Sequence, residues 1–267
     1  MARALIAGLL RHGVPADRIS VGEPSAAARS TLEHDFQVHS NPDNAAAVGG
    51  ADLIVLAVKP QDTGQVLRAV HAALRERSAL LLSIAAGLRI ADLQRACPAG
   101  TAVMRAMPNR AALVGAGVTG LYAPPNVTAA QRLLGELLGT AVGRAVWLRA
   151  EAEIDVVTAV SGSGPAYFFL LAEQLASAGE ALGLSADTAA LLATATLQGA
   201  GQLTQQPGSL AEQRAAVTSR GGTTEAALQA LHAGGFEALI ARAVQAASAR
   251  SSQLADTLGA ALQTDPP

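Results

Sequence analysis

Three short stretches rich in Gly, Ser, Thr and Pro carry the residues best suited to chemistry, and each adjoins a predicted element. The first, Ala57–Gln61 (AVKPQ), follows the strongest predicted strand, residues 52–58. Ligands of open α/β sheets bind beyond the carboxyl ends of the strands, which would place Lys59 at the edge that holds a cofactor. A turn in which Pro60 merely starts the next helix explains the same residues equally well.

The second stretch is Ser161–Tyr167 (SGSGPAY). Pro165 suits the first position of a helix, and Ser163 or Gly164 suits its N-cap. The exposed N–H groups of such a helix start would favour an anion. Ordinary helix capping accounts for this stretch without any ligand.

The third stretch is Val217–Glu225 (VTSRGGTTE), directly before a predicted helix. Paired glycines let the backbone approach a ligand closely. Its four hydroxyl groups and the helix N-terminus could bind a carboxylate or hydrogen-bond a polar ring atom. Helix capping is again the alternative, although four hydroxyl groups exceed what one cap needs.

Other reaction chemistries have little support in the sequence. The five histidines are scattered and have no Cys, Asp or Glu at metal-ligand spacing, so no metal site is predicted. The chain has neither a G-x-S-x-G nor an H-E-x-x-H motif. These residues favour a reaction whose difficult step is carried by a bound cofactor.

Composition narrows the class of protein. Half of the 267 residues are hydrophobic, 15% are charged and the net charge is −2, which indicates neither a nucleic-acid partner nor a membrane-surface partner. The single cysteine, Cys97, excludes an internal disulfide framework and fits a reducing cytosol. No apolar run looks long enough to span a bilayer. We therefore expect a soluble cytoplasmic protein.

The elements that must position these stretches fall into two halves. Residues 1–150 alternate strands with helices, which predicts a doubly wound sheet. Residues 151–267 lack strand signals and predict an all-α domain with helices over 164–182, 186–205, 223–233 and 236–262. Tyr167, Phe168 and Phe169 are neighbours and cannot share one helix stripe, so we expect a second subunit to cover that helix. The predicted strands are 19–22, 36–38, 52–58, 80–84, 102–105 and 145–148, and the helices between them are 25–33, 42–49, 62–75, 89–96 and 128–139.

The start of the chain, MARALIAGLLRHG, predicts a helix over residues 1–10 that ends before Gly13 and Pro15. In doubly wound folds a strand and a Gly-rich phosphate loop come before the first helix. Neither precedes this helix, so we expect the sequence to start late and the sheet to lack its first strand.

Seven segments together resemble the pyrroline-5-carboxylate reductase family, and the similarity runs along nearly the whole chain. The family combines an N-terminal Rossmann-like domain that binds NAD(P)H with a helical C-terminal domain that interlocks with a partner's, and its dimers often assemble into larger rings. The resemblance implies NAD(P)H-dependent reduction of 1-pyrroline-5-carboxylate to L-proline, the last step of proline biosynthesis. The segments are ARALIAGLL, ADLIVLAVKPQ, SIAAGL, MRAMPN, AVSGSGPAYFF, VTSRGGTTEAAL and GGFEALIARAV.

The resemblance also implies roles for individual residues. It makes Thr224 the catalytic group, whose hydroxyl hydrogen-bonds the ring nitrogen of the substrate. The residues implied to bind substrate are Glu151, Ser161, Ser163, Ser219, Gly221, Gly222 and Thr223, and those implied to bind cofactor are Asn44, Ala57, Val58, Lys59, Pro60, Ile84, Ala85 and Ala86.

Three positions complicate the resemblance. Arg110 and Arg220 stand where the family often has Thr and Pro. Glu23 follows the second strand of the fold, where an acid binds a ribose 2′-OH and favours NADH. Arg29 could compensate, and the family's usual preference makes NADP(H) the expected cofactor, with NAD(H) possible.

Two alternative functions remain open at this point. One is another imine reductase of the same architecture; the related β-hydroxyacid reductases use a lysine in the helical half, and no lysine follows Lys59 here. The other is a dimeric scaffold with impaired catalysis, because a chain without the phosphate loop would lose backbone donors to the cofactor pyrophosphate.

Overall fold

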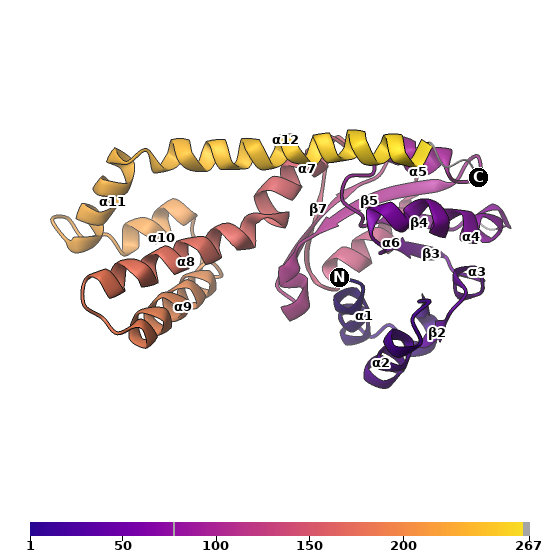
Figure 1. Ribbon diagram of the computed structural model, residues 1–267, viewed down its shortest axis with the longest axis horizontal. Coiled ribbons are helices and arrows are strands. Elements are labelled where there is room, and N and C mark those ends of the chain that lie inside the picture. The colour runs from indigo at the N-terminus through magenta and orange to yellow at the C-terminus, as the bar shows by residue number, and fades with distance from the viewer. Residues whose placement is uncertain (77, 264–267) are drawn as a thin grey trace. The chain divides into compact units, whose positions relative to one another are not determined.

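The computed structural model describes residues 1–76 and 78–263, which divide into two compact units (Figure 1). The first unit combines Met1–Gly162 with the chain from Ala247 onward, and the second comprises Ser163–Ala246. These bounds differ from the predicted division at residues 150 and 151. The difference arises because the segment after Glu151 and the end of the last helix both pack within the first unit.

The first unit alternates helices and strands, as the sequence predicted. Its helices are α1 (Ala2–Arg11), α2 (Ala26–Phe36), α3 (Asn44–Ala47), α4 (Thr63–Glu76), α5 (Ile90–Arg95), α6 (Ala129–Thr140) and α7 (Glu153–Val157). Its strands are β1 (Ser20–Gly22), β2 (His39–Asn41), β3 (Leu53–Leu56), β4 (Leu80–Ser83), β5 (Ala102–Pro108), β6 (Gly117–Tyr122) and β7 (Gly143–Trp147).

The strands form two sheets. One has five strands in the order β3-β4-β5-β6-β7, and the other pairs β1 with β2 in parallel. The Rossmann-like class is therefore confirmed, although β6 runs antiparallel to β5 and was not among the predicted strands. The predicted strand over residues 36–38 is wrong. Phe36 ends α2, Gln37 takes a left-handed conformation with φ of 57°, and β2 begins only at His39.

The core lies on both faces of the five-stranded sheet. All four residues of β4 are buried, which explains its unbroken apolar sequence. Because successive strand residues point to opposite faces, Leu82 and Met104 pack in the cluster that includes α1, while Leu81 and Val103 pack in the cluster that includes α4 and α5. The same alternation places the side chains of Ser83 and Arg105 on the second of these faces.

Helix α1 packs against parts of both sheets. Ala4 and Leu5 belong to the cluster on the five-stranded sheet, and Ile6 packs in a separate cluster beside β1. Within the described residues β1 pairs only with β2 and β3 only with β4, so each has one edge without a strand partner.

The second unit is helical. Helices α8 and α9 pack together as a hairpin (Figure 1), and α12 begins in this unit and ends in the first. The predicted helices are confirmed, but α10 was missed although Ser209 and Glu212 form a capping box at its start. The elements are α8 (Gly164–Ala181), α9 (Ala186–Leu203), α10 (Leu210–Ala216), α11 (Thr223–Ala233) and α12 (Phe236–Gln263).

Most large apolar side chains of the second unit are exposed. Phe168 and Phe169 on α8 are 60% and 56% exposed, and Leu191 and Leu192 on α9 are 67% and 52% exposed. Residues 153–181 also form one helical run that is long and apolar enough to cross a membrane by length and composition, contrary to what we expected from the sequence. The same pattern is typical of a helix that is covered by another protein chain.

Candidate functional site

The predicted cofactor residues follow the carboxyl ends of strands in the first unit. Asn44 begins α3 beside the end of β1, where a Cβ on Gly22 would overlap the Asn44 side-chain oxygen. Lys59 is exposed and precedes the 3₁₀ turn Pro60–Asp62, so Pro60 does start a helical segment as the simpler interpretation held. The exposure of Lys59 leaves a cofactor role open as well.

The turn after β4 contains the other predicted cofactor residues, Ile84, Ala85 and Ala86. Ala85 is buried and its N–H group donates to Ser83 Oγ at 3.3 Å, whereas Ala86 is exposed. Gly87 has φ of +75°, a conformation that glycine adopts without strain. The turn therefore presents one small exposed residue, Ala86, directly after the contact between Ser83 and Ala85 that fixes its first end.

Arg105 and Glu151 form an ion pair that sequence reasoning missed. Arg105 Nη1 lies 3.1 Å from Glu151 Oε1, and their side chains are 5% and 26% exposed. The same carboxylate oxygen accepts the Ile90 N–H group at 2.7 Å. Glu151 was predicted to bind substrate, but its carboxylate here binds two groups of its own unit.

The turn between β1 and α2 bears on cofactor choice. Glu23 Oε1 accepts the Ser25 N–H group at 2.8 Å, so this carboxylate is engaged in holding its own turn. Arg29 Nη1 donates to the carbonyl oxygens of Glu23 and Pro24 at 2.8 and 2.9 Å. The acid and the base discussed in the sequence therefore lie at one turn.

The stretch Ser161–Pro165 is helical: it joins the π-helical turn Thr158–Gly162 to the start of α8, and the boundary between the units falls after Gly162. In the first unit Ser161 Oγ donates to Val157 O at 3.0 Å, and Asn109 Nδ2 donates to Ser161 O at 3.2 Å. Ser163 is the N-cap of α8 but makes no side-chain capping bond. Arg110, next to Asn109, is exposed.

The Gly-rich loop of the second unit leads into α11. Gly221 has φ of +71°, and its N–H group donates to Glu225 Oε2 at 2.7 Å. The Gly222 N–H group donates to Ser219 O at 3.0 Å. Thr223 and Thr224 open the helix, and within the described residues their N–H and hydroxyl groups make no hydrogen bond.

These contacts refine the predicted anion site. The sequence suggested that the N–H groups from Gly221 to Thr223 would hold a carboxylate, but the two glycine N–H groups are already used inside the loop. Among the described residues, the N–H groups left without a partner at this helix start belong to Thr223, Thr224 and Glu225. Arg220 is exposed and has no hydrogen bond within the described part of the chain.

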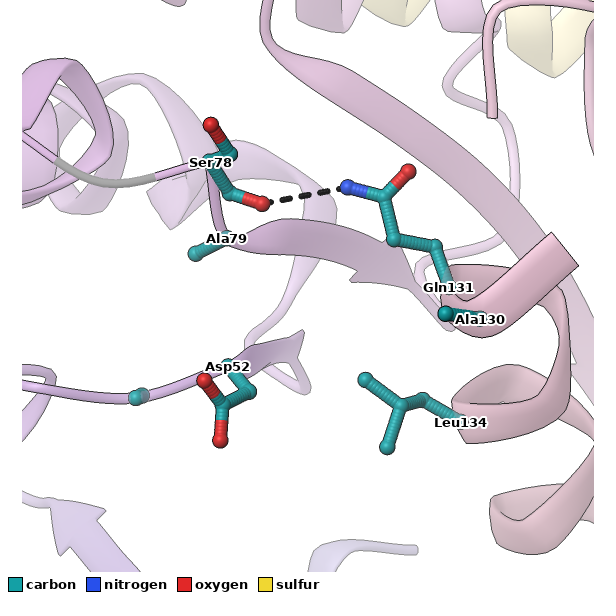
Figure 2. A pocket seen from close by; sticks show the side chains of 7 residues that line it. Asp52, Ser78, Ala79, Ala130, Gln131 and Leu134 are labelled. Carbon is teal, nitrogen blue, oxygen red and sulfur yellow. Dashed lines mark hydrogen bonds between the residues drawn. The ribbon is translucent and has the colours of Figure 1, made fainter. Parts of the chain in front are cut away.

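A cavity of about 500 Å³ lies elsewhere in the first unit. Figure 2 shows it between the residues that precede β3 and β4 and the first turns of α6, with Gln131 Nε2 donating to Ser78 O at 3.1 Å. The cavity adjoins the amino ends of the strands, whereas ligands of open α/β sheets bind at the carboxyl ends. None of the predicted site residues lines it; the lining residues are Ala51, Asp52, Ser78, Ala79, Ala130, Gln131 and Leu134.

Residues 1–76 and 78–263 form no metal-binding cluster and no reactive thiol site. No group of three or more His, Cys, Asp or Glu side chains there is placed to bind a metal ion. Cys97 is buried, and burial raises the pKa of its thiol to about 12, so the thiol stays protonated and unreactive at neutral pH.

Comparisons with known proteins bear on both units. Residues 151–254 match the family model described as pyrroline-5-carboxylate reductase dimerisation. Residues 1–87 match the model described as NADP oxidoreductase coenzyme F420-dependent.

Similar proteins cover nearly the whole chain. A pyrroline-5-carboxylate reductase of Pseudomonas aeruginosa is 48% identical over 97% of this chain and 95% of its own length. A solved pyrroline-5-carboxylate reductase from Coxiella burnetii superposes with a TM-score of 0.91 at 37% identity, covering 95% of this chain and 94% of the other. The Plasmodium falciparum enzyme, solved with NADP bound, superposes with a TM-score of 0.79 at 27% identity over the same shares of the two chains. The chain belongs to the pyrroline-5-carboxylate reductase family.

Proposed function

We propose that this chain reduces 1-pyrroline-5-carboxylate to L-proline with NADPH, the last step of proline biosynthesis, as a cytoplasmic homodimer. The observation that supports the substrate assignment is the start of α11. There the N–H groups of Thr223 and Thr224 point out of an 11-residue helix without partners among the described residues. Such a helix N-terminus favours a carboxylate, and the substrate carries one.

Thr224 is the group that we assign to the reacting ring. When NADPH is bound, its nicotinamide supplies the hydride that reduces the C=N bond. A protonated imine is already electrophilic, so the chain needs to orient the ring and hold its proton rather than provide a strong acid. The Thr224 hydroxyl accepts the ring N–H, while the α11 N–H groups hold the carboxylate. Ser219 and the Ser161–Ser163 segment complete the proposed substrate-binding set.

The cofactor residues that we propose lie at the carboxyl edge of the first unit. Asn44, Ala57–Pro60 and Ile84–Ala86 follow strand ends, as expected for a dinucleotide in an open α/β sheet. The exposed Lys59 supplies a cation and the small Ala86 leaves room for a flat ring. The solved relative from Plasmodium falciparum, which carries NADP, supports a nicotinamide cofactor for this chain.

Thr224 is tested by steady-state kinetics. Thr224→Val keeps the shape of the side chain but removes its hydroxyl, and we expect kcat/KM for 1-pyrroline-5-carboxylate to fall about 100-fold. Thr218→Val is the matched control, since the Thr218 hydroxyl donates to Arg214 O at 2.6 Å and serves only its local turn. An unchanged kcat/KM in Thr224→Val would remove Thr224 from the mechanism. A folded wild-type dimer without turnover would favour the scaffold alternative.

The preference for NADPH rests on the turn between β1 and α2. The Glu23 carboxylate binds its own turn, and the Arg29 guanidinium lies at the same turn. An arginine at this place accommodates a ribose 2′-phosphate. We expect Arg29→Ala to raise KM for NADPH about tenfold, because it removes about one charge-assisted hydrogen bond to the 2′-phosphate. KM for NADH should stay nearly unchanged. Equal effects on both cofactors would exclude this role, and the exposed Arg18 provides a control for loss of positive charge.

A further inference from the structure

Glu151 is held by two groups that lie far from it in the sequence. Its Oε1 atom accepts the Ile90 N–H group at 2.7 Å and pairs with Arg105 Nη1 at 3.1 Å. Arg105 comes from β5 and is almost fully buried, and Glu151 lies between β7 and α7. A buried arginine is costly unless a carboxylate pairs with it, so this pair fixes where Glu151 lies.

The Ile90 N–H group is the end of the turn that follows β4. The turn starts at Ser83, whose hydroxyl accepts the Ala85 N–H group, and it ends where Ile90 opens α5. In the sheet register Ser83 lies beside Arg105, and strand alternation puts both side chains on the same face. Ser83 thus fixes the first end of the turn directly. Its neighbour in the sheet, Arg105, fixes the second end through Glu151.

We propose that Arg105 and Glu151 are positioning residues that hold the Ile84–Arg89 turn in the shape that binds the cofactor. The exposed Ala86 lies between the anchored ends, so its place depends on both of them. Glu151 then acts on cofactor affinity through the Ile90 N–H group and does not contact the substrate. The proposal rests on the assignment of Ile84–Ala86 to the cofactor edge.

The first test distinguishes a local loosening of the Ile84–Arg89 turn from a general loss of stability. Glu151→Gln keeps the size of the side chain but removes the charge that pairs with Arg105, and its amide oxygen is a weaker acceptor for the Ile90 N–H group than the carboxylate is. Glu153→Gln is the matched control, because Glu153 lies two residues away and its Oε2 accepts only the Arg149 N–H group, at 2.9 Å. We expect faster amide hydrogen exchange over residues 84–92 in Glu151→Gln and none of this change in Glu153→Gln.

The second test measures function. In Glu151→Gln we expect Kd and KM for NADPH to rise by about tenfold to a hundredfold, as for a small misplacement of a binding group, with KM for 1-pyrroline-5-carboxylate unchanged. A double change, Arg105→Met with Glu151→Leu, replaces the ion pair by apolar groups and should recover the melting temperature. It should still bind NADPH weakly, because the Ile90 N–H group has lost its acceptor.

Three results would overturn the proposal. One is amide exchange over residues 84–92 that does not change in Glu151→Gln. Another is a rise in KM for the substrate alone, which would return Glu151 to the substrate pocket. The third is normal NADPH affinity in the double variant. Failure of the wild-type chain to bind NADPH would instead reject the proposed cofactor edge, and hydrogen exchange would still report whether Glu151 holds the turn.

Discussion

The two units of this chain solve the problem of burying apolar surface differently. The first has three clusters of buried side chains, with Leu80, Leu81 and Leu82 fully buried in one strand. Among the described residues of the second unit, only two hydrophobic residues are buried, Ala189 and Ala193. Its larger apolar side chains, such as Phe168 and Leu191, lie more than half exposed.

This difference indicates what each unit needs in order to be stable. A unit with its own core can hold a cofactor edge in place as a single chain. Helices whose apolar faces are exposed need a partner to cover them, and the family model that matches residues 151–254 describes dimerisation. Both observations support the proposed homodimer, in which a second copy of this chain would cover these helices.

The largest expected effect is a loss of assembly. Phe168→Asp combined with Leu192→Asp would bury two charges in the proposed interface, so we expect the dimer Kd to rise at least about 1000-fold. Light scattering coupled to size exclusion measures the mass, and the activity assay measures the consequence. Leu133→Asp on α6, at a side chain that is 66% exposed in the first unit, is the control. A double variant that stays dimeric would place the interface elsewhere.

The next effect concerns the open strand edges of the first unit. A designed apolar strand with a Gly-rich turn, fused ahead of Met1, tests whether the open edges of β1 and β3 accept a strand and whether new N–H donors bind a pyrophosphate. Two or more such hydrogen bonds should tighten NADPH binding at least about 100-fold. A fusion with alanines in place of the glycines should raise the melting temperature without this gain. If neither fusion changes either quantity, the two edges do not accept a strand.

Truncating one leucine in each unit sharpens the contrast further. Leu82→Ala opens a cavity in the first core and should lower the free energy of unfolding by about 2–5 kcal/mol. Leu191→Ala removes a side chain that is 67% exposed, so it should act only through assembly. Urea midpoints measured at several protein concentrations distinguish the two, since only the second effect should depend on concentration.

The last prediction uses Cys97, the one cysteine of the chain, as a reporter of the first unit. Burial raises its pKa from 9.0 to about 12, so at pH 8 iodoacetamide should react about 1000-fold more slowly than in the unfolded chain. The unfolded thiol loses its proton first, so this group contributes stability below about pH 9 that is lost as the pH rises toward 12. Rapid labelling in native buffer would show that the first unit opens readily.

The sequence predicted the strongly patterned elements well. The apolar run of β3 and the long helices of the second unit depend on local periodicity, which a single sequence carries. Helix α10 was also within reach, because Ser209 and Glu212 are a capping signal that went unused. Hydrophobic periodicity and capping residues were sufficient to predict an element wherever its own residues determine its conformation.

Other elements depend on partners that no local pattern reveals. Strand β6 contains Gly117 and Gly120, and it is a strand because β5 and β7 pair with it on either side. Strand β2 consists of His39, Ser40 and Asn41, which are poor strand formers that pair with β1.

The candidate site divides in the same way. Its Gly, Ser and Thr motifs could be found from the sequence, and their roles stay predictions. The pairing of Arg105 with Glu151 could not be found, because the two residues lie 46 positions apart and no local pattern links the MRAMPN segment to Glu151. The contact of Glu225 with the Gly221 N–H group was missed as well, since an acid in a first helical turn is read as a simple cap.

The last helix has a consequence for how the chain folds as it is made. Leu258 and Leu262 pack against the core around α4 and α5, and Asp256 pairs with Arg89 at 2.7 Å. Ser251 Oγ also donates to Asp155 Oδ1 at 2.6 Å. The N-terminal unit therefore contains parts that leave the ribosome after the helical unit. It can begin to fold early in translation, but its core closes only after the whole helical unit has been synthesised.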